Sequence, residues 1–485
     1  MATLLPEAAC PGALGVIEVC GLAADSRAIE PGWVFFAVPG AKADGSTFID
    51  QAIAKGAVAI VSERQPATPV GSGTAFILVD DVRHALARAA ATFYPSQPET
   101  IVAITGTSGK TSVAAFCRQI WTQLGAQAAS LGTLGIVAPD GAVYGSLTTP
   151  DPVALQKSLD DLARNGVTHL ALEASSHGIE QKRLDGVKLS AGAFTNLSRD
   201  HLDYHGTIEA YLKAKLRLFE TLLARGQPAV INADSDAAAD VIAACKTRGL
   251  DIISVGRAGR RLRLVDVRPD DLAVALTLEV EGRPMRTRLP LAGEFQISNA
   301  LIAAGLCIAT GGAPDAVLAA LETLEGAPGR LQLVGRRGSA PVFVDYAHKP
   351  DALDKVLSTL RPLTTGRLVA VFGCGGDRDQ GKRPIMGEIA ARLADRVIVT
   401  DDNPRSEEPR AIRAAILAGT RNGHAEIVEI GDRAIAIDTA VASLATGDVL
   451  IIAGKGHETG QIIGDRVLPF SDLDAALGAL QNHPA

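Results

Sequence analysis

Residues 100–116 read TIVAITGTSGKTSVAAF, an apolar run followed by a glycine-rich turn and an apolar stretch of helical length. The run predicts a buried strand, and the later stretch predicts a helix. The glycines between them would let backbone N–H groups approach phosphates, while Lys110 would meet the phosphate charge and the Thr111 hydroxyl could hold Mg²⁺. The stretch departs from the pattern G-x-x-x-x-G-K-[ST], because Ile104 stands at the first glycine. It predicts a strand–loop–helix unit that binds phosphates.

The whole chain has 485 residues, of which 47% are hydrophobic and 21% charged, and its net charge is -7. This length indicates roughly two to four domains. The acidic balance argues against a nucleic-acid binder. The six cysteines are scattered without a C-x-x-C pair, which favours neither a metal site nor a disulfide framework. With no basic signal region and no apolar run of roughly 18 residues, we expect a cytoplasmic enzyme without membrane insertion.

Three segments differ in patterning. Residues 1–97 alternate short apolar runs with helical stretches and end in the linker-like YPSQPET. Residues 98–333 carry strands such as THLALEAS and PAVINAD between helix-length stretches, as in a parallel sheet. Near 250–295 the pattern alternates as antiparallel strands do, and APGRLQLVGRRGSAP then suits a linker. Residues 334–485 alternate strands with helices.

The predicted fold is therefore α/β with three domains: a small N-terminal α/β domain, a central P-loop-type, mostly parallel sheet, and a C-terminal Rossmann-like doubly wound sheet. In the last segment, polar or glycine-rich residues directly follow the apolar runs, as in FGCGGDRD, VTDDNPR and AGKGHE. Ligands of open α/β sheets bind beyond the carboxyl ends of the strands. These stretches predict a binding site at that edge.

The stretch TIEAYLKAKLRLFETLL places a lysine in unusual surroundings. Apolar residues at helical spacing form one stripe: Ile208, Leu212, Phe219 and Leu222. Lys215 lies within it, whereas Lys213 and Arg217 point away. An ammonium in an apolar stripe loses hydration, so the pKa of Lys215 should fall. A neutral amine can take up carbon dioxide as a carbamate, an anion able to bind Mg²⁺; a snorkelling lysine is the alternative.

The loop TGTSGKT resembles that of the Mur ligases, ATP-dependent amide-forming enzymes of peptidoglycan precursor synthesis, and of their folylpolyglutamate synthetase relatives. The resemblance continues through DSR, LEASSHG, FTNLSRDHLDYHG, APGR, VDYAHKPDAL, FGCGGDRDQGKRP, DDNPR and AGKGHE, over nearly the whole chain. It implies that ATP converts a carboxylate to an acyl phosphate, which an amine attacks, so that ADP and phosphate are released. Such chemistry is chiefly charge neutralisation and positioning. Ser108 and Leu147 stand where the family commonly has asparagine, and Leu147 receives no ligand role.

The resemblance also implies the reacting centre. Glu173 ends the run THLALE, and a buried carboxylate is costly without a cation, for which Mg²⁺ is the natural partner; a helix-cap role is the alternative. His205 is expected to be structural. The residues implied in catalysis are Lys110, Glu173, His201 and Lys215. The implied Mg²⁺ ligands are Thr111, Glu173, His201 and Lys215, the last as a carbamate.

Two binding sites follow from the same resemblance. The positions matched to ATP are Gly106, Thr107, Ser108, Gly109, Lys110, Thr111, Ser112, Asn299, Arg330, Asp345 and His348. Those matched to UDP-N-acetylmuramoyl-L-alanyl-D-glutamate are Ser26, Ala41, Lys42, Ala43, Thr148, Thr149, Ser175, Gln181 and Arg183. The first domain, residues 1–97, would bind the UDP-sugar, and we expect a monomer.

The stretch D-N-P-R resembles the family's signature for meso-diaminopimelate, and lysine-adding relatives depart from it at the arginine. A guanidinium meets a carboxylate through two parallel hydrogen bonds, so Arg405 suits the extra carboxylate of meso-diaminopimelate. Glu458 suits the distal ammonium. The matched positions are Arg378, Asp402, Asn403, Pro404, Arg405, Gly454 and Glu458.

Other functions stay open on the sequence. A lysine-adding Mur ligase or a folylpolyglutamate synthetase-like enzyme would share the loop, although nothing in the sequence resembles a pteridine pocket. A P-loop kinase rarely needs a further sheet domain of the length of residues 334–485. A dehydrogenase is disfavoured because Arg378 occupies the last glycine position of G-x-G-x-x-G.

Overall fold

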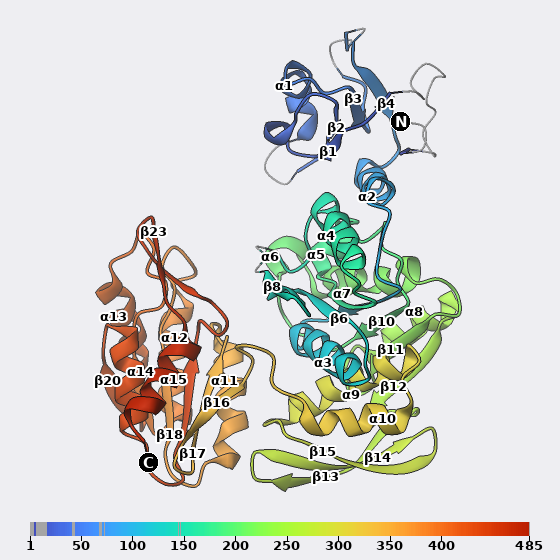
Figure 1. Ribbon diagram of the computed structural model, residues 1–485. Helices are drawn as coiled ribbons and strands as arrows, with labels where there is room; N and C mark the ends of the chain where they lie inside the picture. The colour runs from blue at the N-terminus through green and yellow to red at the C-terminus, as the bar shows by residue number, and fades with distance from the viewer. Residues whose placement is uncertain are drawn as a thin grey trace. The chain divides into compact units, whose positions relative to one another are not determined.

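The computed structural model describes residues 4–5, 17–40, 44–66, 70–71, 73–143, 145 and 147–484. Its strands form separate four-, eleven-, six- and two-stranded sheets within these residues, and Figure 1 shows them with their helices. The predicted α/β class with parallel sheets in several domains is confirmed. The boundaries at 97/98 and 333/334 stay predictions. Among the described helices, none is long and apolar enough to cross a bilayer.

The first sheet is parallel, in the order β1-β2-β3-β4. Its strands are β1 Gly21–Ala23, β2 Trp33–Phe36, β3 Ala59–Ser62 and β4 Ala75–Leu78. The helices are α1 Ile49–Ala54 and α2 Val82–Phe93. Alternate strand residues face two separate apolar clusters, because successive side chains of a strand point to opposite faces: Val34 and Phe36 belong to one cluster and Phe35 to the other.

The second sheet has the order β15-β14-β13-β12-β11-β10-β5-β9-β6-β7-β8. Its strands are β5 Thr100–Thr105, β6 Ala128–Gly132, β7 Gly135–Ala138, β8 Gly141–Val143, β9 His169–Glu173, β10 Ala191–Phe194, β11 Pro228–Asn232, β12 Asp251–Gly256, β13 Leu262–Asp270, β14 Ala273–Val280 and β15 Arg283–Leu289. β5 pairs in parallel with β9 and β10. Two-residue turns join β13, β14 and β15, a connection that antiparallel strands make, so the antiparallel pattern predicted near 250–295 is confirmed for these three strands. It is wrong for β12, which pairs in parallel with β11 and β13.

Helices connect these strands. They are α3 Lys110–Gln123, α4 Pro152–Arg164, α5 Ser176–Glu180, α6 Leu202–His205, α7 Ile208–Arg217, α8 Ala238–Arg248, α9 Glu294–Ala309 and α10 Pro314–Ala320. Leu155 and Leu159 of α4 pack with Ile101 and Ala103 of β5 in one buried cluster. The predicted strand and helix around the glycine-rich turn are confirmed as β5 and α3.

The third sheet has the order β16-β17-β21-β18-β19-β20. Its strands are β16 Gln332–Arg337, β17 Ala340–Asp345, β18 Leu368–Phe372, β19 Arg396–Val399, β20 Glu426–Glu429 and β21 Val449–Ala453. β16 pairs antiparallel with β17, and the other pairs are parallel. The linker predicted at APGRLQLVGRRGSAP is therefore wrong in part, because pairing with β17 makes its middle a strand.

Helices cover both faces of this sheet: α11 Pro350–Leu360, α12 Lys382–Leu393, α13 Pro409–Gly419, α14 Arg433–Ala442 and α15 Asp472–Asn482. Within β18, Leu368, Ala370 and Phe372 face the cluster formed with α11, α12 and α13. Val369 and Val371 face the cluster formed with α14 and α15. This is the doubly wound arrangement predicted for the last segment. A separate hairpin consists of β22 Gly460–Ile463 and β23 Arg466–Pro469.

The chain divides into two compact units, each described by itself below. The first comprises residues 1–264, 279–283 and 301–317, and the second comprises residues 265–278, 284–300 and 318–485.

Candidate active site

The glycine-rich stretch forms the turn between β5 and α3. Gly106 and Gly109 have φ values of 141° and 88°, in the region that favours glycine. A Cβ on Gly106 would overlap Oγ1 of Thr195. Gly109 is the N-cap of α3, so the first N–H groups of that helix face the turn. This is the local geometry that binds phosphate groups.

The segment after β10 forms hydrogen bonds with the glycine-rich turn. The backbone N–H of Ser108 donates to Oδ1 of Asn196 at 3.0 Å, and Thr195 Oγ1 donates to the Ser108 carbonyl at 2.7 Å. Thr107 Oγ1 donates to the carbonyl of Ser198 at 3.2 Å. Two of these contacts use the backbone of Ser108, and together the three fix the shape of the loop against the segment that follows β10.

Two lysine amines meet at this loop. Lys110 Nζ donates to the carbonyls of Gly106 and Thr107, both at 2.9 Å. Lys215 Nζ, which comes from α7, donates to the same Gly106 carbonyl at 2.8 Å. The structure therefore brings together two cations that lie far apart in the sequence.

Lys215 is only 1% exposed, and its amine lies 4.1 Å from the centre of the Tyr211 ring. Burial, and then the charge of Lys110, lowers the pKa of Lys215 well below its usual value. The predicted burial and lowered pKa are confirmed, and the snorkelling alternative is wrong. Arg217 points elsewhere and donates to Asp185 at 2.6 and 2.8 Å.

Glu173 ends β9 and is 2% exposed. Its carboxylate accepts hydrogen bonds from the N–H of Thr133 at 2.8 Å and from Thr133 Oγ1 at 3.2 Å. A Cβ on Gly132 would overlap this carboxylate. Because Ser175, and not Glu173, is the N-cap of α5, the helix-cap alternative is wrong. Thr111 and Ser112 are buried in the first turn of α3.

His201 is the N-cap residue of α6 with φ 52°, and its side chain is 45% exposed. Its ring lies 4.9 Å from that of His177, which lies 4.2 Å from the ring of Tyr204. His205 Nε2 is 2.9 Å from Ser176 Oγ, the kind of buried contact expected of a structural histidine. Sequence reasoning missed His177 as a member of this cluster, although it lies within LEASSHG.

The residues matched to the peptide substrate adjoin Glu173. Thr148 Oγ1 and Thr133 Oγ1 are 3.1 Å apart. Thr149 Oγ1 donates to the Glu173 carbonyl at 2.8 Å and accepts from the N–H of Ser175 at 3.0 Å. These side chains therefore form one network around the end of β9.

Two further matched residues extend this network. Arg183 donates to the carbonyl of Thr149 at 2.5 Å and to Oε1 of Gln181 at 2.7 Å. Gln181 Nε2 donates to the Tyr204 hydroxyl at 3.1 Å. Leu147 is 49% exposed, in keeping with the absence of a ligand role.

In the first sheet, Ser26 is 5% exposed and its hydroxyl donates to Oε1 of Gln51 at 2.7 Å. The other residues matched there lie outside the described residues: Ala41, Lys42 and Ala43.

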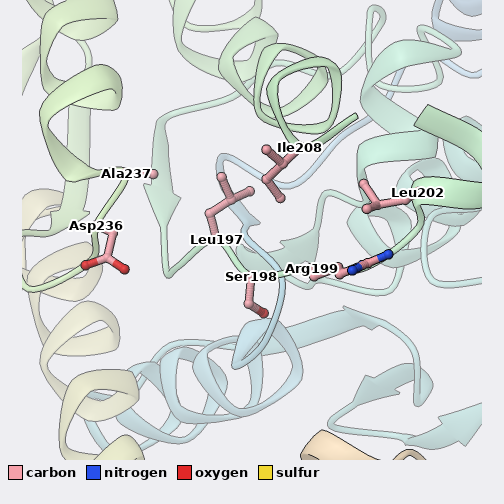
Figure 2. Close-up of a pocket in the computed structure, with 7 residues that line it drawn as sticks. All are labelled: Leu197, Ser198, Arg199, Leu202, Ile208, Asp236 and Ala237. Carbon is pink, nitrogen blue, oxygen red and sulfur yellow. The ribbon is translucent and has the colours of Figure 1, made fainter. Parts of the chain in front are cut away.

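A pocket of about 460 Å³ borders the segment that supports the phosphate loop. Figure 2 shows Leu197, Leu202 and Ile208 around it, with Ser198 and Arg199 between them and Asp236 from the segment before α8. Ser198 also contacts Thr107 of the loop. The sequence analysis named Ile208 as part of the apolar stripe around Lys215, but it did not predict this pocket.

In the second unit, the remaining residues matched to the nucleotide lie together. Asn299 Nδ2 donates to Gln296 Oε1 at 3.1 Å, and Gln296 Nε2 donates to the Arg330 carbonyl at 3.4 Å. The Arg330 guanidinium lies 4.9 Å from the centre of the Tyr346 ring, and its buried Nε has no hydrogen-bond partner among the described residues. The ring of Tyr346 lies 4.5 Å from that of His348.

Asp345 ends β17 among these residues. Its carboxylate accepts from the N–H groups of Leu331 at 2.6 Å and Ala347 at 2.7 Å. Burial nevertheless raises the pKa of Asp345 to about 6, against the opposing charge of Arg330. The matched residues Asn299, Arg330, Asp345 and His348 are thus neighbours.

The stretch D-N-P-R follows β19, as predicted. Asp402, Asn403 and Pro404 are buried, whereas Arg405 is half-buried with φ 51°. The Arg405 guanidinium donates to the carbonyl of Gly376 at 2.8 Å. This contact shows that the arginine is not merely a solvated charge, because it is tied to the glycine-rich loop after β18.

Lys455 adds a cation that sequence reasoning missed. It is fully buried, and Nζ donates to Oδ1 of Asn403 at 3.1 Å and to Oε2 of Glu458 at 2.9 Å. Asn403 Nδ2 donates to the same Glu458 oxygen at 2.9 Å. The carboxylate assigned to a distal ammonium is therefore partly balanced by Lys455, which lies in the quoted stretch AGKGHE.

Gly454 and Arg378 complete the matched set. A Cβ on Gly454, which has φ 117°, would lie 2.6 Å from Asp402 Oδ2. A Cβ on Gly375 would lie 2.8 Å from the Arg405 guanidinium and 3.9 Å from Cγ of Arg378. Arg378 itself is exposed. Because Gly375 and Gly454 have no side chain, the segments that follow β18, β19 and β21 can pack closely against one another.

Beneath this edge lies a buried ion pair that the sequence did not reveal. Arg433 and Asp472 are both 0% exposed at their side chains and approach to 2.6 Å. Arg433 also donates to the carbonyl of Ala453 at 2.9 Å and to that of Asp401 at 3.3 Å. It therefore links the ends of β19 and β21.

Comparison with known proteins agrees with this geometry. The models for the Mur ligase family catalytic domain, the Mur ligase middle domain and the Mur ligase glutamate ligase domain match residues 18–94, 104–307 and 329–456. The chain is 59% identical to the UDP-N-acetylmuramoyl-L-alanyl-D-glutamate–2,6-diaminopimelate ligase of Bradyrhizobium diazoefficiens, over 99% of this chain and 98% of that one. It is 54% identical to the protein of that name from Brucella melitensis, over 98% and 97%. The chain belongs to the Mur ligase family.

Solved structures extend the comparison. A structure of a UDP-N-acetylmuramoyl-L-alanyl-D-glutamate–2,6-diaminopimelate ligase aligns with a TM-score of 0.71 at 35% identity, over 96% of this chain and 95% of that one. The folylpolyglutamate synthase of Mycobacterium tuberculosis aligns with a TM-score of 0.61 at 21% identity, over 77% and 92%. The second likeness concerns the fold alone.

Proposed function

We propose that this chain is the ligase that joins meso-diaminopimelate to UDP-N-acetylmuramoyl-L-alanyl-D-glutamate, with ATP as co-substrate, in peptidoglycan precursor synthesis. The observation that carries the proposal is the position of Arg405, half-buried at the end of β19 and tied to Gly376, in a chain 59% identical to a relative of that name. ATP converts the acceptor carboxylate to an acyl phosphate, and the amine of meso-diaminopimelate displaces the phosphate.

The phosphates of ATP would lie on the turn between β5 and α3. Backbone N–H groups at Gly109 and the start of α3 would hold them, and Lys110 would neutralise their charge. We also propose nucleotide-binding roles for four residues of the second unit: Asn299, Arg330, Asp345 and His348. The buried Nε of Arg330, which lacks a hydrogen-bond partner in the part of the chain that the structure describes, suits such a polar ligand.

The family implies Mg²⁺, and the residues present fit it. Thr111 and Glu173 offer the oxygen ligands that this ion prefers, and His201 adds a nitrogen. Within the described residues, no group of three His, Cys, Asp or Glu is arranged to hold a metal; the proposed set needs Lys215 as a carbamate. Bound there, the ion would neutralise phosphate charge. Lys215 is suited to carbamylation because its amine is buried beside Lys110 and its pKa is low.

The acceptor peptide would lie along the network of Thr148, Thr149, Ser175, Gln181 and Arg183, with the uridine on the first domain near Ser26. Arg405 would bind the distal carboxylate of meso-diaminopimelate and Glu458 its distal ammonium. We also propose the three domains 1–97, 98–333 and 334–485, a monomeric state and a cytoplasmic location. No nucleic-acid partner is proposed.

The deciding experiment measures phosphate release from ATP with UDP-N-acetylmuramoyl-L-alanyl-D-glutamate and one candidate amino acid at a time. Release should depend on both substrates, with meso-diaminopimelate far better than L-lysine. Equal efficiency with the two amino acids would contradict the assignment. Release driven by a folate with glutamate would instead identify a folylpolyglutamate synthetase, and transfer to a hydroxyl would identify a kinase.

A further inference from the structure

Arg405 has an unusual backbone. Its φ of 51° lies in the left-handed region, which residues with a side chain rarely adopt. Such a conformation persists only where the surroundings over-determine it, and it is often found at ligand sites. The contacts that hold Arg405 therefore decide where its guanidinium lies.

One set of contacts comes from the hairpin Gly460–Pro469, formed by β22 and β23. The N–H of Arg405 donates to the Ile462 carbonyl at 3.0 Å, and the N–H of Gly464 donates to the Arg405 carbonyl at 2.7 Å. Both backbone groups of the strained residue are thus bound by the hairpin.

The same hairpin also holds the residues before Arg405. Gln461 Nε2 donates to the carbonyl of Asp402 at 2.8 Å. The N–H of Ile462 donates to Oδ1 of Asn403 at 2.9 Å. Four hydrogen bonds from the short run 461–464 therefore fix the backbone and one side chain of the D-N-P-R stretch.

The loop after β18 supports the stretch from another direction. Arg405 donates to the Gly376 carbonyl, and Ser406 Oγ donates to Asp377 Oδ1 at 2.6 Å. Asp377 also has a left-handed backbone, with φ 53°. A Cβ on Gly376 would overlap the carbonyl of Pro404. These contacts engage the side chain of Arg405 and its neighbours, whereas the hairpin engages the backbone groups of Arg405 itself.

The hairpin contributes little to the apolar core. None of the residues 460–469 is buried, and Val467 is 68% and Leu468 45% exposed. Its strands belong to a separate sheet and not to the six-stranded one. The main structural role of the hairpin is therefore to contact residues 402–405.

We propose that the hairpin Gly460–Pro469 is a clamp that sets the amino-acid selectivity of the site by holding Arg405 in its left-handed conformation. Gln461 and Gly464 are the positioning residues. The inference rests on the proposed function, in which Arg405 binds the distal carboxylate. Two parallel hydrogen bonds to a carboxylate require a fixed guanidinium plane, so a small displacement of the backbone weakens that recognition.

Two variants loosen the clamp by different routes. Gln461→Met keeps the length of the side chain but removes the donor to Asp402. Gly464→Val places a side chain at φ +57°, where it is strained although a Cβ there would meet nothing within 4 Å. Gly282→Val is the matched control, since Gly282 has φ +84° in the β14–β15 turn and equally open surroundings. Leu468→Ala controls for a change elsewhere in the hairpin.

The measurement is steady-state kinetics with meso-diaminopimelate and L-lysine, alongside thermal unfolding. Each clamp variant should raise KM for meso-diaminopimelate roughly tenfold with little change in kcat or in KM for ATP, as the loss of one well-placed hydrogen bond does. The preference over L-lysine should fall by the same factor. Both controls should keep the wild-type preference.

Three outcomes would overturn the clamp. Folded variants that keep the full preference would show that Arg405 needs no support from the hairpin. An equal loss of kcat with both amino acids would indicate a general effect on the enzyme. A wild-type enzyme without any preference would overturn the proposed function itself, and the clamp with it, which distinguishes that failure from the other two.

Discussion

The amines of Lys110 and Lys215 donate hydrogen bonds to one backbone oxygen, that of Gly106, at 2.9 and 2.8 Å. Two ammonium groups that share an acceptor repel each other, and Lys215 is also buried. Both effects lower the pKa of Lys215, with burial the larger cause. A lysine that loses its proton easily beside a phosphate-binding loop is suited to become a carbamate.

We expect Lys215→Ala to lower kcat by about 10²-fold or more, the loss typical of removing a group that stabilises charge at a reacting centre. Acetate at high concentration should restore part of the activity by replacing the carbamate. Lys213→Ala, at an exposed lysine on the same helix, should remain active. A fully active Lys215→Arg enzyme would show that a positive charge suffices.

Lys110→Ala should abolish turnover, with kcat lower by about 10³-fold, because the loop loses its cation beside the transferred phosphate. The fold should survive, since the hydrogen bonds of Lys110 to the carbonyls of Gly106 and Thr107 lie within one loop. ADP formation and circular dichroism measure the two expectations. A folded variant that still forms the acyl phosphate would contradict this role of the lysine.

The wild type should prefer meso-diaminopimelate to L-lysine by about 10⁴-fold in kcat/KM, because an analogue without the distal carboxylate leaves a polar site unpaired. Arg405→Ala should lose this preference, and Arg405→Lys should recover only part of it, since an ammonium cannot make the bidentate contact. Arg410→Ala, at an exposed arginine of α13, serves as the control. An Arg405→Ala enzyme that keeps its preference would contradict the assignment.

The buried pair of Arg433 and Asp472 should matter for stability. Arg433→Met leaves the carboxylate of Asp472 buried without its cation, which costs about 3–5 kcal/mol of the free energy of unfolding. The double variant Arg433→Met, Asp472→Leu should recover most of that loss, because no lone charge remains. Urea unfolding of the wild type and both variants measures the difference; equal losses in the single and double variants would argue against it.

Asp345 should make stability depend on pH. Its pKa is about 6 in the folded chain and 3.8 in the unfolded one, so between about pH 4 and pH 6 the folded state binds more protons. The free energy of unfolding should therefore fall as pH rises through this window. Relative to Asp345→Asn, which cannot ionise, the wild type should lose about 2 kcal/mol between pH 4 and pH 6.5.

Chemical unfolding at pH 4 and at pH 6.5 measures this difference. Asp351→Asn, at an exposed position in the first turn of α11, should follow the wild type. A constant difference between wild type and Asp345→Asn at the two pH values would mean that Asp345 keeps an ordinary pKa.

Local sequence patterns were sufficient to predict much of the candidate site. The period of the stripe around Lys215 predicted its burial, because helical spacing places such residues on one face. The apolar run before D-N-P-R predicted a strand end beside Arg405, because parallel strands present their carboxyl ends at one edge. Lys455, Arg433, Gln461 and His177 gave no comparable signal, since each acts through a partner distant in sequence or on another element.

By itself, the sequence determined the α/β class, the phosphate loop between β5 and α3, and the family, because each depends on residue types at short, regular spacing. Tertiary structure alone decided that Lys110 and Lys215 share the Gly106 carbonyl, that Lys455 donates to Asn403, and that residues 461–464 hold Arg405 in a left-handed backbone. The physical reason is that hydrogen bonds and charge interactions act over a few ångströms in space. Gly106 and Lys215 are 109 positions apart along the chain, and nothing in that separation indicates that they are in contact.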